Sequence, residues 1–288
     1  FALIVLGFAI ARLTRWGDAF WEPVEKVTFY VLSPALLFYA TARAPLDFGA
    51  TLPMLGTMMV GLIAGFVLAW LAQPLFRPEP ATFAGGMQCA YRFNSYLGFA
   101  LIARMHGESG LALMAIALVL YVPVVNAVSL WVMVRAKGAL HPWRELARNP
   151  LILSAAAGVL WNWLGLPLSD AAVSVLQRLG QASIALGLLA VGAALRLEFP
   201  GNYRVLVSYW LAVKMIAVPA IVLVCIRALG LTGPSAAVPM LIAALPAATA
   251  TYILAQRMGA DGRIAAMQVS IGVLLAAITV PIWLALLG

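Results

Sequence analysis

Apolar residues occur in this sequence in runs of about twenty, separated by short groups of Arg, Lys, Asp, Glu, Gly and Pro. A helix needs about twenty residues to cross the hydrocarbon core of a bilayer. A run such as 55–71 shows no alternation of polar and apolar residues, which argues against barrel strands. A chain with 64% hydrophobic residues and a mean hydropathy of +1.01 has more apolar surface than a soluble domain can bury. We therefore predict an all-α polytopic membrane protein.

About ten transmembrane helices are expected from these runs. The first run, from Phe1 to Ala11, is too short to cross a bilayer and does not begin with Met, so we expect the native start to be missing. The longest polar connection, 135–149, divides the chain into two halves of five spans. The expected spans are 1–14, 26–42, 50–76, 81–104, 109–135, 150–166, 171–196, 205–228, 234–257 and 263–287.

The basic residues predict the orientation, because Lys and Arg near span ends are retained on the cytoplasmic side. With the N-terminus outside, twelve basic residues fall in the inner connections and three in the outer ones. We therefore expect both termini outside, on the periplasmic side of a bacterial inner membrane, and a cytoplasmic loop at 138–148. The net charge of +8 then follows from topology and from attraction to anionic lipid, so no nucleic-acid partner is expected.

A weak internal repeat relates the two halves. Residues 103–108 read ARMHGE, and residues 256–261 read QRMGAD at the equivalent place in the second half. A displacement of five spans inverts the second copy in the membrane, which is the plan of many secondary transporters. We therefore predict a 5+5 inverted repeat and a carrier.

Spans four and nine carry the polar residues and prolines that predict a binding site. Pro246 removes a backbone donor in the middle of span nine, and the repeat aligns it with the residue before Asn94. Two helices broken at the same depth would form a polar site at the bilayer midplane, although ordinary proline kinks remain an alternative. The candidate substrate-binding residues are Arg92, Asn94, Ser95, Lys214, Pro246, Thr249, Thr251 and Tyr252.

Charged residues deep in the spans indicate the sign of the substrate. Arg92 and Lys214 lie near the middle of spans four and eight, whereas every Asp and Glu lies in a connection or at a span end. The site is therefore positive and suits an organic anion. Alternatively, Arg92 bonds to freed carbonyls of span nine and Lys214 extends toward the interface or a lipid phosphate.

The coupling ion stays open. His106 and His141 fall in connections, so the sequence offers no obvious proton relay, and no cofactor is expected. Sodium is possible, but the same side chains are as well explained by hydrogen bonds between helices. The possible ion-binding residues are Gln88, Gln256 and Gln268, with Asn94 and Thr249 as further oxygen ligands.

Six segments along the chain resemble the auxin efflux carrier family, which includes plant auxin exporters and bacterial malate or malonate permeases. The order and spacing of these segments carry the resemblance over nearly the whole chain. They are VTFYVLSPALLF (27–38), RFNSYLGFALI (92–102), RNPLILSAAAGVLWNWLGLPL (148–168), LGQASIALGLLAVGAAL (179–195), LPAATATYILAQRMGAD (245–261) and QVSIGVLLAAITVPIW (268–283).

This resemblance implies a fixed scaffold and a mobile core that slides against it, with broken spans four and nine crossing at the substrate site. The scaffold would comprise spans 1, 2, 6 and 7 (1–49 and 149–199), and the core would comprise spans 3–5 and 8–10 (50–137 and 200–288). It also implies a homodimer formed through the scaffolds. The family's crossover asparagine corresponds to Asn94 and its span-nine proline to Pro246.

The sequence departs from the family pattern at two places in these spans. Phe99 stands where a proline is expected, and the asparagine expected beyond Pro246 is absent, which leaves Thr249 and Thr251. These differences weaken any inference that auxin itself is the substrate.

Two other function classes are alternatives to a carrier. A channel or facilitator could use the same bundle. An intramembrane enzyme would need a catalytic group at depth, but Ser109 and His106 in the string HGESG lie at a span end without a nucleophile-elbow strand. We therefore predict a transporter and not an enzyme.

Overall fold

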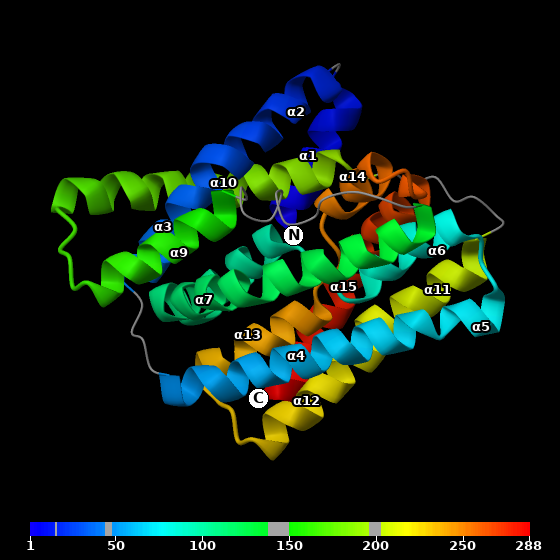
Figure 1. Ribbon diagram of the computed structural model, residues 1–288. Coiled ribbons are helices and arrows are strands. Elements are labelled where there is room, and N and C mark those ends of the chain that lie inside the picture. Colours follow the sequence, from blue (N-terminus) through cyan, green and yellow to red (C-terminus); the bar gives the residue numbers. More distant parts are fainter. Residues whose placement is uncertain (15, 44–47, 138–149, 196–202) are drawn as a thin grey trace. The chain divides into compact units, whose positions relative to one another are not determined.

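The computed structural model describes residues 1–14, 16–43, 48–137, 150–195 and 203–288, and these residues are almost entirely helical (Figure 1). No strand occurs in those ranges. The prediction of an all-helical chain is confirmed. The predicted cytoplasmic loop at 138–148 lies outside the described residues.

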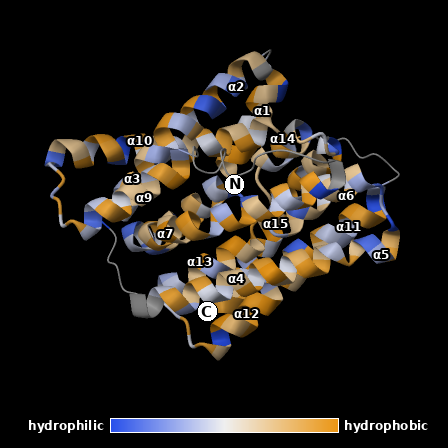
Figure 2. Ribbon diagram, in the orientation of Figure 1, coloured by the Kyte–Doolittle hydropathy of each residue, from blue (hydrophilic) through white to orange (hydrophobic). Residues whose placement is uncertain are grey.

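Within the described ranges, five helical stretches are long and apolar enough to cross a membrane. Figure 2 shows hydrophobic residues along most of their length. Three shorter apolar helices, Ala2–Leu13, Pro150–Trp163 and Gly233–Ala244, add to them. This supports a multi-pass membrane protein, whereas ten spans in an inverted repeat stay a prediction. The five stretches are Thr51–Phe76, Pro80–Arg135, Asp170–Ala193, Arg204–Ala228 and Gly262–Leu287.

The chain forms two compact units, and each contains segments from both halves of the sequence. Unit 1 comprises Phe1–Asp47, Phe99–Pro123 and Trp143–Leu195. Unit 2 comprises Phe48–Gly98, Val124–Pro142 and Arg196–Gly288. The division into two compact units does not show whether one part of the protein moves against another. The scaffold-and-core division therefore stays a prediction.

Unit 1 is built from helices that lie side by side in pairs (Figure 1). The strongest pairs are α3 with α9 and α1 with α10, and α10 also packs on α3. Glycines allow this close approach, because an added methyl group at Gly7 or Gly192 would collide with the backbone of the facing helix. The helices are α1 (Ala2–Leu13), α2 (Asp18–Val27), the π-helix η1 (Thr28–Leu32), α3 (Ser33–Ala42), α9 (Pro150–Trp163) and α10 (Asp170–Ala193).

Unit 2 packs α4 against α12 and α13, and α15 against α13 and α14. Its core contains the fully buried Trp210, whose indole N–H donates to the Ala69 carbonyl at 3.1 Å. Its helices are α4 (Phe48–Trp70), α5 (Ala72–Phe76), α6 (Pro80–Met87), the 3₁₀-helix η2 (Gln88–Ala90), α11 (Arg204–Ala212), the π-helix η4 (Val213–Ala217), α12 (Val218–Ala228), α13 (Gly233–Ala244), α14 (Ala250–Arg257) and α15 (Gly262–Leu287).

Helix α7 (Ser95–Lys137) contributes residues to both units. Gly107 interrupts it with φ 56° and ψ −138°, so that it consists of two helices that meet at this glycine. The sequence prediction of separate spans at 81–104 and 109–135 agrees with this corner.

Candidate functional site

Both helices predicted to be broken are interrupted, and the two breaks touch within unit 2. The first break follows η2, where residues 91–94 leave the helical conformation before α7 begins at Ser95. The second separates α13, which ends at Ala244, from α14, which begins at Ala250. The backbone N–H of Asn94 donates to the carbonyl of Pro246 at 2.7 Å. The predicted interruptions near Asn94 and Pro246 are therefore confirmed, and they face each other.

Each break has a local cause in the sequence. Pro246 has no N–H to continue the hydrogen bonding of α13, and Leu245 before it adopts an extended conformation with ψ 142°. At the first break, the Asn94 side-chain carbonyl accepts from the N–H of Leu97 at 3.2 Å. An asparagine in this position caps the start of α7. The chain thus ends one helix and begins another at both places.

Four buried polar side chains near the breaks have an atom with no hydrogen-bond partner among the described residues. The nitrogen of Asn94 and the hydroxyl of Thr251 belong to completely buried residues. The side-chain carbonyl oxygens of Gln88 and Gln268 are equally unpartnered, although both amide nitrogens donate to backbone carbonyls. Buried polar atoms almost always have a protein, water or ligand partner. This group of atoms therefore has the capacity to bind a polar ligand.

Lys214 of unit 2 is a buried cation, with 2% of its surface exposed. It belongs to the π-helix η4, and its ammonium donates to the Ile242 carbonyl at 3.0 Å, in the last turn of α13. No carboxylate within the described ranges forms an ion pair with it. Lys214, Pro246 and Gln268 line one narrow pocket. The pocket is too narrow to admit a water molecule, so the partner of the ammonium in this structure is the carbonyl of Ile242.

Arg92 has a different environment from Lys214. It is half-buried, and its guanidinium donates to the Ser129 hydroxyl at 3.3 Å, which in turn lies 3.4 Å from the Tyr91 hydroxyl. Arg92 therefore takes part in a polar network with α7.

The other candidate residues divide by burial. Ser95, Thr249 and Tyr252 are half-buried at the starts of α7 and α14. Gln256 is exposed in the last turn of α14, so it does not share the buried environment of Gln88 and Gln268. The alternative serine–histidine pair does not form, because the Ser109 hydroxyl donates to the backbone carbonyl of His106.

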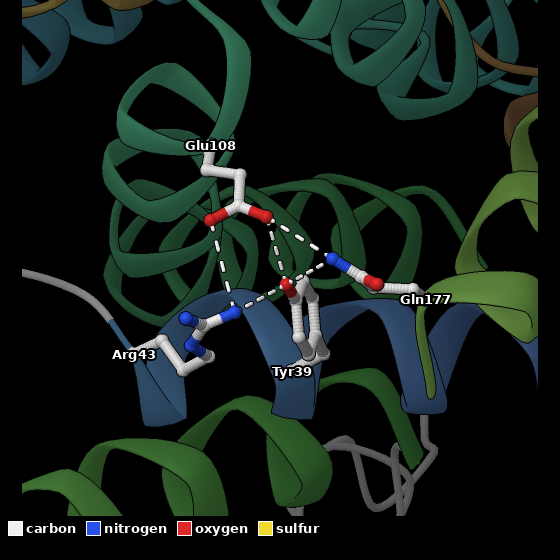
Figure 3. Close-up of polar contacts among 4 residues, drawn as sticks. All are labelled: Tyr39, Arg43, Glu108 and Gln177. Atoms are coloured by element: carbon white, nitrogen blue, oxygen red, sulfur yellow. Dashed lines mark hydrogen bonds and ion pairs between the residues drawn. The ribbon is translucent and has the colours of Figure 1, made fainter. Parts of the chain in front are cut away.

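A polar cluster in unit 1 was not predicted from the sequence (Figure 3). The Tyr39 hydroxyl donates to Glu108 at 2.8 Å and accepts from Arg43 at 2.7 Å and from Gln177 at 2.6 Å. Arg43 and Glu108 also form an ion pair at 3.8 Å. The cluster joins α3 and α10 to the corner of α7 beside Gly107. The only sequence signal was the presence of opposite charges at two span ends.

Together, the apolar helices and the broken pair define a multi-pass membrane protein of the transporter class. Residues 1–284 match the family described as "Membrane transport protein". The chain belongs to this family, the auxin efflux carrier family, and is a transporter and not an enzyme. The resemblance stated from the sequence is confirmed.

Three relatives illustrate the range of the family. The chain is 26% identical over 301 residues to the "Putative malonate transporter" of Rhizobium meliloti (strain 1021), an alignment that covers 97% of this chain and 91% of the relative. It is 22% identical over 302 residues to the "Uncharacterized transporter YfdV" of Escherichia coli (strain K12), which covers 98% and 93%. It is 27% identical over 154 residues to the "Probable auxin efflux carrier component 1b" of Oryza sativa subsp. japonica, which covers 51% and 27%.

Proposed function

We propose that this chain is a secondary transporter that carries a small organic anion with a carboxylate group across the membrane. The observation that carries the proposal is Lys214, a buried ammonium with no described acidic partner beside the broken helix α13. Burying an unpaired charge is costly, so a cation at this depth favours a site that receives an anion during the transport cycle. The printed name of the malonate relative agrees with a small carboxylate.

Hydrogen-bond donors at the two breaks complete the proposed site. The unpartnered amide nitrogen of Asn94 and the hydroxyl of Thr251 can each donate to a carboxylate oxygen. Ser95, Thr249 and Tyr252 stand at the starts of the helices that follow the breaks, where backbone N–H groups favour anions. Arg92 is the second candidate for the positive charge that binds the substrate carboxylate. Its guanidinium donates to the Ser129 hydroxyl in this structure.

We further propose an elevator-type mechanism, in which the core (50–137 and 200–288) slides against the scaffold (1–49 and 149–199) of a homodimer. The contact between the two breaks supports it, because a site formed by both would travel as one piece. Gln88 and Gln268 are the proposed ligands if sodium is the coupling ion, since their buried carbonyl oxygens are unpartnered. A bacterial inner membrane with both termini outside completes the proposal.

The test is transport by the purified protein in liposomes with radiolabelled malonate and a panel of mono- and dicarboxylates. A carrier shows counterflow, in which internal substrate accelerates uptake, whereas a channel does not. Assays with and without sodium, and with an imposed pH gradient, identify the coupling ion.

Variants then identify the residue that supplies the charge. We expect Lys214→Met to weaken substrate binding by roughly tenfold to a hundredfold, as expected for loss of a charge-assisted hydrogen bond. Lys214→Arg keeps the positive charge but changes the packing, so it distinguishes the effect of the charge from that of the packing. Arg92→Gln tests the second candidate. Arg178→Gln is the matched control, because Arg178 is an exposed cation of α10. If Lys214→Met and Arg92→Gln both stay folded and bind substrate with unchanged affinity, the anion-site proposal is wrong.

A further inference from the structure

An open groove runs along unit 2 between α11–η4 on one side and α15 on the other. It has a volume of about 610 Å³, within the range of small-molecule sites. Its walls are apolar over most of their length: Leu211 and Met215 line one side, and Ile271 and Leu275 line the other. Leu211 and Met215 also line the pocket that contains Lys214 and Pro246, but neither Lys214 nor Pro246 lines the groove.

The two walls run in the same direction, so both begin at the same end of the groove. Leu211 faces Gly272. Farther along both helices, the indole N–H of Trp283 donates to the Met215 carbonyl at 2.8 Å. Small exposed residues, Ser208 and Ala212, leave the hollow on the α11 side. Met215 is in contact with Thr279 at the far end. The groove thus runs from Arg204 to Met215, where the contacts of Met215 with Thr279 and Trp283 close it.

The end of the groove at the start of α11 carries positive charge. Arg204, the first residue of α11, is exposed and lines the groove. No side chain caps the start of α11, so its first-turn N–H groups add to the positive end of the helix. Arg263 is exposed at the start of α15, where Asp261 is the helix cap. Arg204 lines the groove, and Arg263 stands one turn before the lining residue Met267, so this end carries two exposed cations.

The length of the groove matches one leaflet of a bilayer. Arg204 and Met215 are eleven residues apart, or about 17 Å along a helix, compared with about 15 Å for half of the hydrocarbon core. Arginines at span ends lie at the membrane interface, where they attract anionic headgroups. A groove of this length with a charged end and apolar walls is complementary to a phospholipid.

We propose that the groove binds an anionic phospholipid, with its phosphate at Arg204 and one acyl chain between α11–η4 and α15. Arginine suits the phosphate because its guanidinium donates two parallel hydrogen bonds. The apolar walls hold the acyl chain of the bound lipid apart from the disordered lipid around the protein, and the cationic end selects the headgroup. A zwitterionic lipid gains less from this end, because its own positive group opposes the two arginines.

The proposal is tested with detergent-purified, delipidated protein and native mass spectrometry of bound lipid. Phosphatidylglycerol and phosphatidylcholine with identical chains are compared, and inorganic phosphate serves as a headgroup-only probe. We expect phosphatidylglycerol to bind at least fivefold more tightly than phosphatidylcholine, and Arg204→Gln to remove about fivefold of its affinity. Ala212→Leu fills the hollow, so it weakens binding of both lipids without changing the preference between them.

Matched controls separate the groove from the rest of the apolar surface. Arg178→Gln and Ala171→Leu make the same substitutions at exposed positions of α10, and we expect neither to change lipid binding. In the unaltered protein, raising the salt concentration should reduce the preference for phosphatidylglycerol, which requires no variant to fold. Equal binding of the two lipids, an unchanged preference in Arg204→Gln, or equal occupancy by inorganic phosphate alone would each overturn the proposal.

Discussion

Replacing Tyr39 with phenylalanine removes the hydroxyl at the centre of the unit 1 cluster and keeps the aromatic ring. That hydroxyl makes three hydrogen bonds of 2.6–2.8 Å, to Glu108, Arg43 and Gln177. Glu108 keeps the amide of Gln177 at 3.2 Å and the guanidinium of Arg43 at 3.8 Å, so only the tyrosine's own bonds are lost. The ring itself is buried, with 5% of the residue exposed, and Tyr39→Phe leaves its packing intact.

The magnitude follows from the partners. A bond to a charged group contributes about 1.5–3 kcal/mol when buried, but the side chains of Arg43 and Glu108 are 47% and 63% exposed, so water replaces much of each bond. We expect a net loss of roughly 1–2 kcal/mol, which corresponds to a decrease in melting temperature of about 2–8 °C. The measurement is thermal unfolding of the detergent-purified protein followed by intrinsic tryptophan fluorescence.

Tyr30→Phe is the matched control, because Tyr30 lies in the same unit and is 63% exposed. We expect it to leave the melting temperature unchanged. A double-mutant cycle of Tyr39→Phe with Glu108→Gln should give an interaction energy of at least about 0.5 kcal/mol. If Tyr39→Phe melts at the same temperature as Tyr30→Phe, the cluster does not stabilise the junction of α3, α10 and α7, and the reasoning is refuted.

Two further predictions concern packing and topology. Gly192→Ala should destabilise the protein by about 1–3 kcal/mol, because its methyl group meets the α1 backbone at Ile4. The control Gly56→Ala should not, because nothing lies within 4 Å of that position. Equal melting temperatures of the two variants in thermal unfolding would contradict the close approach of α1 and α10. Gly138→Cys, made together with Cys89→Ala and Cys225→Ala, should resist an impermeant maleimide in intact cells and react after permeabilisation. Labelling from outside would reverse the predicted orientation.

The helices could be predicted from the sequence because the bilayer sets their length. The expected spans at 50–76, 171–196, 205–228 and 263–287 each correspond to helices within a few residues of those bounds. The break at Pro246 was predictable because proline removes a backbone donor. The break at Asn94 could be predicted only from the density of polar residues in span four and from the alignment of the two halves.

Other features depend on contacts that a single sequence does not reveal. The π-turns at Thr28–Leu32 and Val213–Ala217 have no local signal, because the residues within them are ordinary helix residues. The Tyr39 cluster brings together residues from three separate segments, and Glu108 alone looked like a residue of a connection. The same applies to the site: Lys214 stood out as a charge at depth, but its bond to Ile242 required the fold.

The hydrogen bond between the N–H of Asn94 and the carbonyl of Pro246 is made entirely by the main chain. Substitutions of the side chains around it can therefore change shape, charge and selectivity while this joint between the two helices persists. A proline at position 94 is the exception, because it alone among the common residues has no N–H to donate. In the proposed site, side-chain substitutions can therefore alter substrate specificity while the main-chain bond between Asn94 and Pro246 continues to join the two helices.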